Sequence, residues 1–353
     1  MKILVIQQKM IGDVLVSSLL CDNLRKAYPE AQIDYMVYES TTAVLQGNTS
    51  FNKLVLFREK HRNSKWEFFK LIRSIRKEKY DIIIDAYSKM ESWLIVLFSG
   101  APKKISYWKK NTNFIYTHPV KKEKAPDISG SIIDVRLSLL TPLKLVFPLK
   151  NTPEIHVSRE EKEFASSLFA KHNVDPENQT IMLNVLGSSE SKTYPFIHMA
   201  EVIDFIAEKG DVNLLFNYHP KQISEASKIL NYCKESTRKK VYFTVFGKSI
   251  REFIAIMDNC DMIIGNDGGA INMAKALKKP SFIIFSPWID KAGWATFEDG
   301  INNVSVHLRD HKPELFEEQD AAAVKKNALK MYQQFPPNLF FPALGGFLDR
   351  HLD

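Results

Sequence analysis

The chain has 353 residues, of which 45% are hydrophobic and 25% are charged. This length and composition predict two folded domains with sizeable cores and exclude a largely disordered chain. The formal net charge of +7 favours an anionic partner, such as a nucleotide, a phosphorylated glycolipid, a membrane surface or a nucleic acid.

Cysteine usage and the apolar runs of the chain indicate a cytoplasmic protein. Cys21, Cys233 and Cys260 are far apart and lack the spacing of metal ligands, so we interpret them as reduced thiols. The apolar run in residues 1–8 is too short for a secretory signal. No other stretch approaches the ~20 apolar residues of a membrane span.

The first part of the chain alternates between strand and helix patterns, which predicts a doubly wound α/β sheet. The first strand covers residues 2–7, and a helical pattern follows at 14–28. Further strands are expected at 32–38, 53–57, 80–85 and 104–107, with helices at 64–78 and 88–98.

The turn after the first strand contains Lys9, Gly12 and Asp13. It lies at the carboxyl end of the strand, which is where open α/β sheets bind their ligands. A simpler interpretation is that Asp13 only caps the helix that follows. The sequence leaves both interpretations open.

Two basic segments in this half each have two interpretations. Residues 103–124 interleave seven lysines with aromatic residues, and they are either solvated surface or an electrostatic seat for an anionic acceptor. Residues 65–77 have apolar side chains at helical spacing, which either pack on the sheet or adsorb to an anionic membrane. The lysines of the first segment are Lys103, Lys104, Lys109, Lys110, Lys121, Lys122 and Lys124.

A linker rich in proline and asparagine at 143–157 leads to a second α/β series. A final helix is expected at 317–334, and an apolar tail broken by prolines, 335–342, should lie against the body of the protein. The other elements expected are strands at 180–185, 212–216, 241–245 and 301–307, and helices at 159–172, up to 209, up to 235 and at 249–260.

Residues 260–285 organise the second half of the chain. They read as a buried strand, a turn with Asn266, Asp267, Gly268 and Gly269, a helix of small residues and a second buried strand. The two glycines allow backbone N–H groups to approach a ligand phosphate. The simpler interpretation is that Asp267 only caps the helix.

Three motifs in this order give the chain its resemblance to a known family. They are Ile-Gly-Asp-Val-Leu at 11–15, Gly-Ser-Ser at 187–189 with Lys192, and residues 265–285. Over about residues 2–330 the chain resembles glycosyltransferase family 9, the ADP-heptose:lipopolysaccharide heptosyltransferases. The resemblance implies a GT-B architecture of two Rossmann-like domains facing a central cleft. Residues 1–150 would bind the acceptor, and residues 151–353 would bind the nucleotide-sugar and include a C-terminal helix and tail.

The resemblance also implies a role for each matching residue. Asp13 would be the general base and Lys192 the lysine that binds the diphosphate. The chain has no Asp-x-Asp metal motif, so Lys192 and a helix N-terminus would stabilise the leaving group without metal or cofactor. The other donor-binding residues would be Ser188, Ser189, Asp267, Gly268, Gly269 and Asn272, and residues Lys9, Gly12, His219, Lys109, Lys110, Lys121 and Lys122 are candidates for the acceptor side.

Three departures from the family pattern bear on the donor. Asn272 stands where many members have histidine, and residues 286–290 replace the usual Gly-Pro-Thr. Residues 217–221 contain no counterpart of the glutamate that is expected to touch the ribose. The identity of the donor therefore stays open.

The resemblance therefore implies an inverting glycosyltransferase that moves heptose from ADP-heptose to a lipopolysaccharide core or a related glycolipid. It would act at the cytoplasmic face of the inner membrane, with peripheral contact to the membrane. Two alternatives are a nucleotide-sugar epimerase of the same twin-Rossmann architecture and a non-catalytic protein that binds nucleotide-sugars. Nucleic-acid binding is disfavoured, because no recognition motif accompanies the basic residues.

Overall fold

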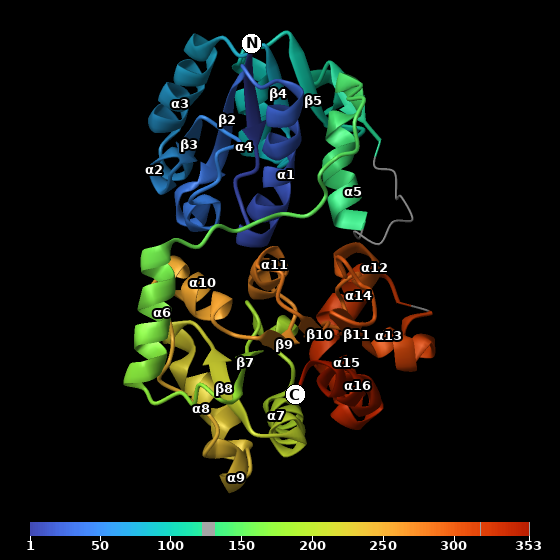
Figure 1. The fold of residues 1–353 in the computed structure, drawn as a ribbon. Helices are drawn as coiled ribbons and strands as arrows, with labels where there is room; N and C mark the ends of the chain where they lie inside the picture. The colour runs from blue at the N-terminus through green and yellow to red at the C-terminus, as the bar shows by residue number, and fades with distance from the viewer. Residues whose placement is uncertain (122–130, 318, 353) are drawn as a thin grey trace. The chain divides into compact units, whose positions relative to one another are not determined.

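The computed structural model describes residues 1–121, 131–317 and 319–352. The chain divides into two compact units, Met1–His156 and Val157–Asp353, and each unit has its own parallel β-sheet (Figure 1).

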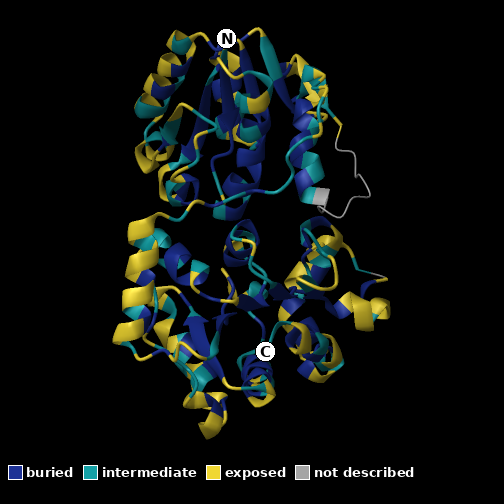
Figure 2. Ribbon diagram, viewed as in Figure 1, coloured by how far each residue is buried: buried dark blue, intermediate teal, exposed yellow. Residues whose placement is uncertain are grey.

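The sheet of the first unit has six strands in the order β3-β2-β1-β4-β5-β6, all of them parallel. The order reverses between β1 and β4, as in a doubly wound fold. Residues Ile3 to Ile6 of β1 are fully buried, because helices cover a parallel sheet on both faces (Figure 2). The strands are β1 (Lys2–Ile6), β2 (Gln32–Tyr38), β3 (Lys53–Phe57), β4 (Ile82–Asp85), β5 (Lys103–Tyr107) and β6 (His118–Val120).

The helices of the first unit follow the strands in alternation. Helix α3 packs Leu71 and Ile75 into the core, as one interpretation expected, whereas its Trp66 and Phe69 are exposed. The helices are α1 (Ile11–Ala27), α2 (Glu59–Asn63), α3 (Lys65–Glu78), α4 (Met90–Phe98) and α5 (Ser131–Leu137), with 3-10 turns η1 (Glu39–Leu45), η2 (Asn113–Ile115) and η3 (Ser138–Leu143).

The sheet of the second unit has five parallel strands in the order β11-β10-β9-β7-β8. Its strands are β7 (Gln179–Asn184), β8 (Val212–Asn217), β9 (Met262–Asn266), β10 (Ser281–Ile284) and β11 (Asn303–Val306). The helices are α6 (Arg159–Lys171), α7 (Phe196–Lys209), α8 (Ile223–Tyr232), α9 (Glu235–Arg238), α10 (Ile250–Asp258), α11 (Gly269–Ala276), α12 (Lys291–Trp294), α13 (Leu308–His311), α14 (Ala321–Lys326), α15 (Ala328–Gln333) and α16 (Phe341–His351), with 3-10 turns η4 (Glu190–Lys192), η5 (Pro220–Gln222), η6 (Pro313–Phe316) and η7 (Pro337–Leu339).

The predicted fold class, two Rossmann-like α/β units, is confirmed, but two predicted elements are wrong. The strand expected at 241–245 is a single bridge from Val241 to Leu214, because the chain then turns and the Val245 N–H bonds to the Tyr242 carbonyl. The helix expected at 317–334 contains two short helices, α14 and α15, with a break at Asn327 between them.

The C-terminal tail packs onto the body of the second unit, as its apolar composition predicted. Phe335 and Phe340 are buried, and their rings lie 6.0 and 6.1 Å from the ring of Tyr194. Helix α16 follows them and adds Leu344 and Phe347 to the same core. The sequence did not predict this helix, because prolines precede it and Pro342 lies inside its first turn.

The three cysteines are buried and form no disulfide, as expected for reduced thiols. Burial raises the pKa of the Cys233 thiol to about 12. Within the ranges that the structure describes, no helix is long and apolar enough to cross a membrane.

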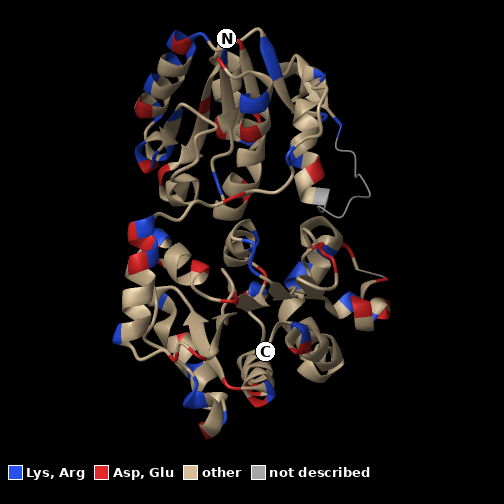
Figure 3. Ribbon diagram, viewed as in Figure 1, with Lys and Arg blue, Asp and Glu red and all other residues tan. Residues whose placement is uncertain are grey.

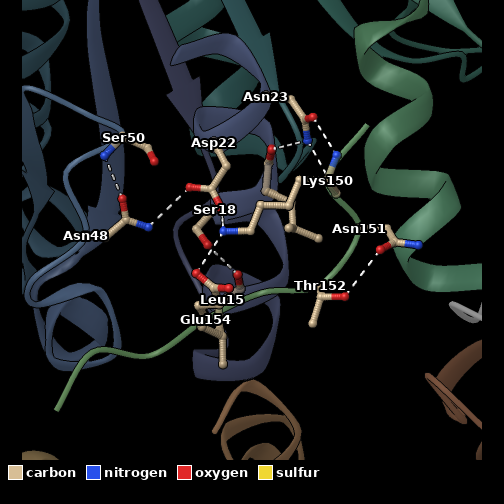
Figure 4. Close-up of polar contacts among 11 residues, drawn as sticks. Leu15, Ser18, Asp22, Asn23, Asn48, Ser50, Lys150, Asn151, Thr152 and Glu154 are labelled. Atoms are coloured by element: carbon tan, nitrogen blue, oxygen red, sulfur yellow. Dashed lines mark hydrogen bonds and ion pairs between the residues drawn. The ribbon is translucent and has the colours of Figure 1, made fainter. Parts of the chain in front are cut away.

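A reciprocal pair of hydrogen bonds holds the linker segment to the first unit (Figure 4). The Lys150 N–H donates to Asn23 Oδ1 at 2.8 Å, and Asn23 Nδ2 donates to the Lys150 carbonyl at 2.9 Å. The Lys150 ammonium group also pairs with Asp22 at 3.0 Å and Glu154 at 3.1 Å. These contacts hold the linker within the first compact unit, which extends to His156.

Replacing Asn23 with alanine should weaken this attachment. The variant loses both bonds to Lys150 and leaves a small void, because Asn23 is fully buried. We expect the free energy of unfolding to fall by ~1–3 kcal/mol in urea titrations. The matched control is Asn151→Ala, since Asn151 accepts its bond from the adjacent Thr152. An equal loss of stability in both variants would contradict a specific role for the Asn23–Lys150 hydrogen bonds.

Candidate functional site

The strand order of the second unit reverses between β7 and β9, and we call this switch point the crevice, after the crevice that open α/β sheets have there. Strands β7 and β9 are neighbours, but the chain leaves them toward opposite sides of the sheet. Such a switch point is the usual ligand site of an open α/β sheet. Both polar turns singled out from the sequence lie there, with residues 187–192 after β7 and residues 267–272 after β9.

Three asparagines brace the ends of the strands at this crevice. Asn184 Nδ2 donates to the Asn266 carbonyl at 2.5 Å, and Asn266 Nδ2 donates back to the Asn184 carbonyl at 2.9 Å. Asn217, at the end of β8, donates to Asn184 Oδ1 at 2.9 Å. The three strands therefore end in one hydrogen-bonded network.

Two glycines are required by the close approach of the backbone. Gly265 has φ of +139°, and a Cβ there would lie 2.4 Å from the Asn184 carbonyl oxygen. A Cβ at Gly187 would lie 2.3 Å from the Lys192 carbonyl oxygen. The loop between Gly187 and Lys192 can close tightly only because position 187 has no side chain.

Lys192 and Asp267 come together across the crevice. Lys192 Nζ lies 3.6 Å from Asp267 Oδ2, and both side chains are largely buried. Burial raises the pKa of the Asp267 carboxyl, and the nearby Lys192 ammonium group opposes that rise. The pair places one cation and one buried carboxylate directly beside the helix that follows β9.

That helix, α11, begins at Gly269 with Gly268 as its N-cap, so Asp267 is not the capping residue. The first backbone N–H groups of a helix have no partner within the helix, so this end of α11 favours an anion. Asn272 donates back to the Gly268 carbonyl at 3.5 Å. Ser188 and Ser189 are exposed on the facing loop.

Two lysines, Lys192 and Lys325, lie near the ring of Trp288. Lys192 Nζ lies 5.4 Å from the centre of the Trp288 ring, and Lys325 Nζ lies 4.6 Å from it. The indole N–H donates to the Ser191 carbonyl at 3.1 Å, which fixes the ring against the Lys192 loop. The sequence did not point to Lys325, because the contact depends on how α14 packs.

A pocket of about 320 Å³ lies at the end of β8, within the size range of small-molecule sites. Its walls are mainly aromatic and aliphatic, with His219 and Lys248 among the polar residues. His219 Nδ1 accepts a bond from the Lys221 N–H at 3.2 Å. The apolar walls are formed by Met182, Phe216, Val245, Phe246, Ile250 and Phe253.

The first unit also has a polar group at its switch point between β1 and β4. Asp13 is the third residue of α1, and its Oδ1 accepts from Arg136 Nη2 at 2.6 Å. Its Oδ2 accepts from the Met10 N–H at 3.4 Å. Asp13 therefore supports the start of the helix and forms an ion pair at the same time.

Arg136 is the residue that sequence reasoning missed here. It is 8% exposed, and its Nη1 donates to Tyr107 Oη at 2.8 Å and to the Ala86 carbonyl at 3.3 Å. Burial raises the pKa of the Tyr107 hydroxyl. Arg136 and Asp13 are 123 positions apart, so no local pattern links them.

The remaining candidates of the first unit differ in exposure. Lys109 donates to the Ser88 carbonyl at 2.8 Å, whereas Lys110 and Lys121 are exposed. Lys9 Nζ lies 5.2 Å above the Tyr38 ring, and Gly12 is buried in α1. Lys122 and Lys124 lie outside the described residues. In the described part of the chain no group of three or more metal-binding side chains is placed to hold a metal ion.

Comparisons with known proteins point to one family. The model of glycosyltransferase family 9 (heptosyltransferase) matches residues 68–325. Lipopolysaccharide heptosyltransferase 3 of Escherichia coli is 25% identical over 291 residues, which cover 78% of this chain and 80% of that protein.

Two solved structures share the fold over almost their whole length. A family 9 glycosyl transferase from Veillonella parvula has a TM-score of 0.74 and 17% identity, covering 96% of this chain and 97% of that one. The Escherichia coli heptosyltransferase WaaC, solved with ADP-2-deoxy-2-fluoro heptose, has a TM-score of 0.63 and 15% identity, covering 95% and 99%.

A buried lysine lies on the helix that follows the Asp267 turn. Lys275, on α11, donates to the carbonyl and hydroxyl oxygens of Thr296. Burial lowers the pKa of its ammonium group to about 8, although Glu298 and Asp267 oppose the shift. The burial of this charge could not be predicted from the sequence, because it depends on how Thr296 packs against α11.

This lysine should make stability depend on alkaline pH. Between pH 8 and about 10.4, the usual lysine value, the unfolded chain keeps a proton that the folded chain has released. Raising the pH through this window therefore stabilises the folded protein, by up to ~3 kcal/mol. Lys275→Met should lack this gain, whereas Lys330→Met, at an exposed site, should keep it. Identical pH profiles for the native protein and Lys275→Met in urea unfolding would contradict the assignment.

Proposed function

The chain belongs to glycosyltransferase family 9, and from this membership we propose that it transfers heptose from ADP-heptose to a lipopolysaccharide core or a related glycolipid. The reaction inverts the anomeric carbon and takes place at the cytoplasmic face of the inner membrane. The observation that carries the proposal is the crevice between β7 and β9, where Lys192, Asp267 and the start of α11 lie together. The relative WaaC, which binds an ADP-sugar analogue, supports an ADP-linked donor.

We assign the donor to the second unit. Its diphosphate would bind Lys192 and the first N–H groups of α11, because both favour an anion. The nucleobase would enter the pocket at the end of β8, whose apolar walls suit a flat ring. Trp288 and Lys325 flank the same Lys192 and would add a second cation on the diphosphate side.

Two neutral amides take the place of the missing glutamate in this proposal. Asn217 lines the pocket, and Gln222 Nε2 donates to the Gly187 carbonyl at 3.3 Å, next to the loop of Lys192. An amide can donate to and accept from the ribose hydroxyls, whereas a carboxylate only accepts. The ribose contact would therefore be kept with a weaker, uncharged partner.

We assign the proton transfer to Asp13. As the acceptor oxygen forms its bond to the anomeric carbon, the bond from that carbon to the diphosphate breaks. The acceptor proton passes to Asp13, and the diphosphate leaves with its charge balanced by Lys192. Arg136 occupies Asp13 Oδ1, so Oδ2, which has one long bond from Met10, is the oxygen available to take the proton. The exposed Lys110 and Lys121 are proposed to meet acceptor phosphates.

The test is to supply ADP-heptose and a truncated core acceptor to the purified protein and to measure the masses of the products by mass spectrometry. We expect an acceptor that has gained one heptose, with release of ADP. Epimerised or free sugar formed from the donor alone would favour the epimerase instead. Retained donor without transfer to any of a panel of acceptors would favour a non-catalytic binding protein.

Asp13→Asn should separate catalysis from binding. The amide keeps the size of the side chain and can cap a helix, but it cannot take the proton, so kcat should fall by ~10²–10⁴ while donor affinity changes only a few-fold. The variant also leaves Arg136 without its counter-ion, so assays are run below the measured melting temperature. Asp13→Glu restores a carboxylate and should recover part of the rate. An unchanged kcat in Asp13→Asn would refute the assignment.

Lys192→Ala should weaken binding only of ligands that carry the diphosphate. The loss of one charged hydrogen bond predicts ADP affinity lower by ~1.5–3 kcal/mol, about 10- to 150-fold, with adenosine affinity nearly unchanged. Calorimetric titration with both ligands measures this difference. Lys330→Ala is the matched control, since it removes an exposed lysine of α15. Equal losses for ADP and adenosine would point to a distorted loop instead of a diphosphate contact.

A further inference from the structure

Helix α4 of the first unit has an outer face that is apolar. Ser92, Ile95 and Val96 face the core and are buried. The opposite side carries four large apolar side chains at spacings of four, three and one residues, which places them together on one face of a helix. They are Met90, Leu94, Leu97 and Phe98, with exposed fractions of 65%, 37%, 40% and 48%.

The 3-10 turn η2 packs beside α4 and extends this face. Its Ile115 is buried and anchors the turn, whereas the adjacent Phe114 is 77% exposed. We call Met90, Leu94, Leu97, Phe98 and Phe114 the apolar face. A soluble protein seldom exposes so many large apolar side chains on adjacent elements unless they contact a partner.

Lysines border the apolar face at both ends of α4. Lys109 Nζ donates to the Ser88 carbonyl at 2.8 Å, just before the helix, and Lys104 Nζ donates to the Leu97 carbonyl at 3.4 Å, near its end. Residues 89–121, which include the helix and turn, contain six lysines and one acidic residue, Glu91, a net charge of +5. A lysine therefore flanks the apolar face at each end of α4.

The neighbouring helix α3 is also basic, because residues 65–78 contain five lysines and arginines and two glutamates, a net charge of +3. There Glu67 pairs with both Lys60 and Lys70, and Figure 3 shows acidic and basic segments alternating along α2 and α3. Net positive charge is therefore found on α3 as well as around α4. α3 contributes Trp66 and Phe69, which are exposed and stacked at 6.0 Å.

We propose that the apolar face docks the protein on a bilayer that contains anionic lipids. The apolar side chains enter the boundary between headgroups and acyl chains, and the lysines contact lipid phosphates. The negative potential of such a surface attracts lysines, and insertion of apolar side chains adds to this attraction, so the combination suits a bilayer. A second copy of the chain is the poorer occupant, because it would bring a second segment of net charge +5 against this one.

The inference deepens the proposed function, since a glycolipid acceptor lies in a bilayer, but its test needs neither donor nor acceptor. The protein is sedimented with vesicles of phosphatidylcholine alone or mixed with phosphatidylglycerol, at low and moderate salt. We expect binding to the mixed vesicles that weakens with salt, and little binding to phosphatidylcholine alone. The double variant Leu94→Ser, Phe114→Ser should bind the mixed vesicles at least ~10-fold more weakly, because two apolar side chains that would insert into the bilayer are lost.

A matched control changes two exposed apolar residues of the second unit, Ile197→Ser and Ile223→Ser, and should bind vesicles as the native protein does. Both double variants alter exposed positions, so melting temperature and ADP affinity should stay unchanged, and a failed lipid result can be told apart from a failed donor site. The inference is overturned if the native protein ignores anionic vesicles or if the Leu94, Phe114 variant binds as tightly as the control. It is also overturned if ultracentrifugation shows a dimer that this variant dissociates.

Discussion

The reciprocal hydrogen bonds between Asn184 and Asn266 are the contact on which the second unit's site depends. They join the last residues of β7 and β9, the two strands from which the chain departs to opposite sides of the sheet. Asn266 also accepts from the Tyr194 N–H at 2.7 Å, and this bond ties down the end of the loop that carries Lys192. One side-chain pair thus sets the distance between the Lys192 loop and the Asp267 turn. The positive φ of Gly265 follows from the same close approach.

Much of the fold could be predicted because buried parallel strands read as continuous apolar runs, as Ile3 to Ile6 and Met262 to Ile264 do. The segment 241–245 has the same strand-forming residue types, yet it forms one bridge, because strand propensity does not say whether a partner strand lies alongside. Helix α16 was missed because prolines were interpreted only as breaks in the chain. Proline is also common at the first positions of a helix, as Pro342 is in α16.

The site divides in the same way between local and tertiary information. Lys192, Asp267 and Gly268 stand in polar turns that can be recognised from adjacent residues. The structure brings the two turns together through the Lys192–Asp267 ion pair. Arg136 reaches Asp13 across 123 positions, and Lys325 meets Trp288 only through the packing of α14, so neither contact has a sequence signal. The composition gives the net positive charge, but only the fold shows where the lysines lie. Some lie around Trp288 and some beside α4.

The central claim is that the crevice between β7 and β9 holds the diphosphate of an ADP-sugar. A crystal structure of the protein soaked with ADP tests it most directly. The account predicts diphosphate density within hydrogen-bonding distance of Lys192 Nζ and the first N–H groups of α11, with the adenine in the pocket lined by Phe246 and Ile250. ADP bound in the first unit, or bound in the second unit with its diphosphate away from Lys192, would contradict the account.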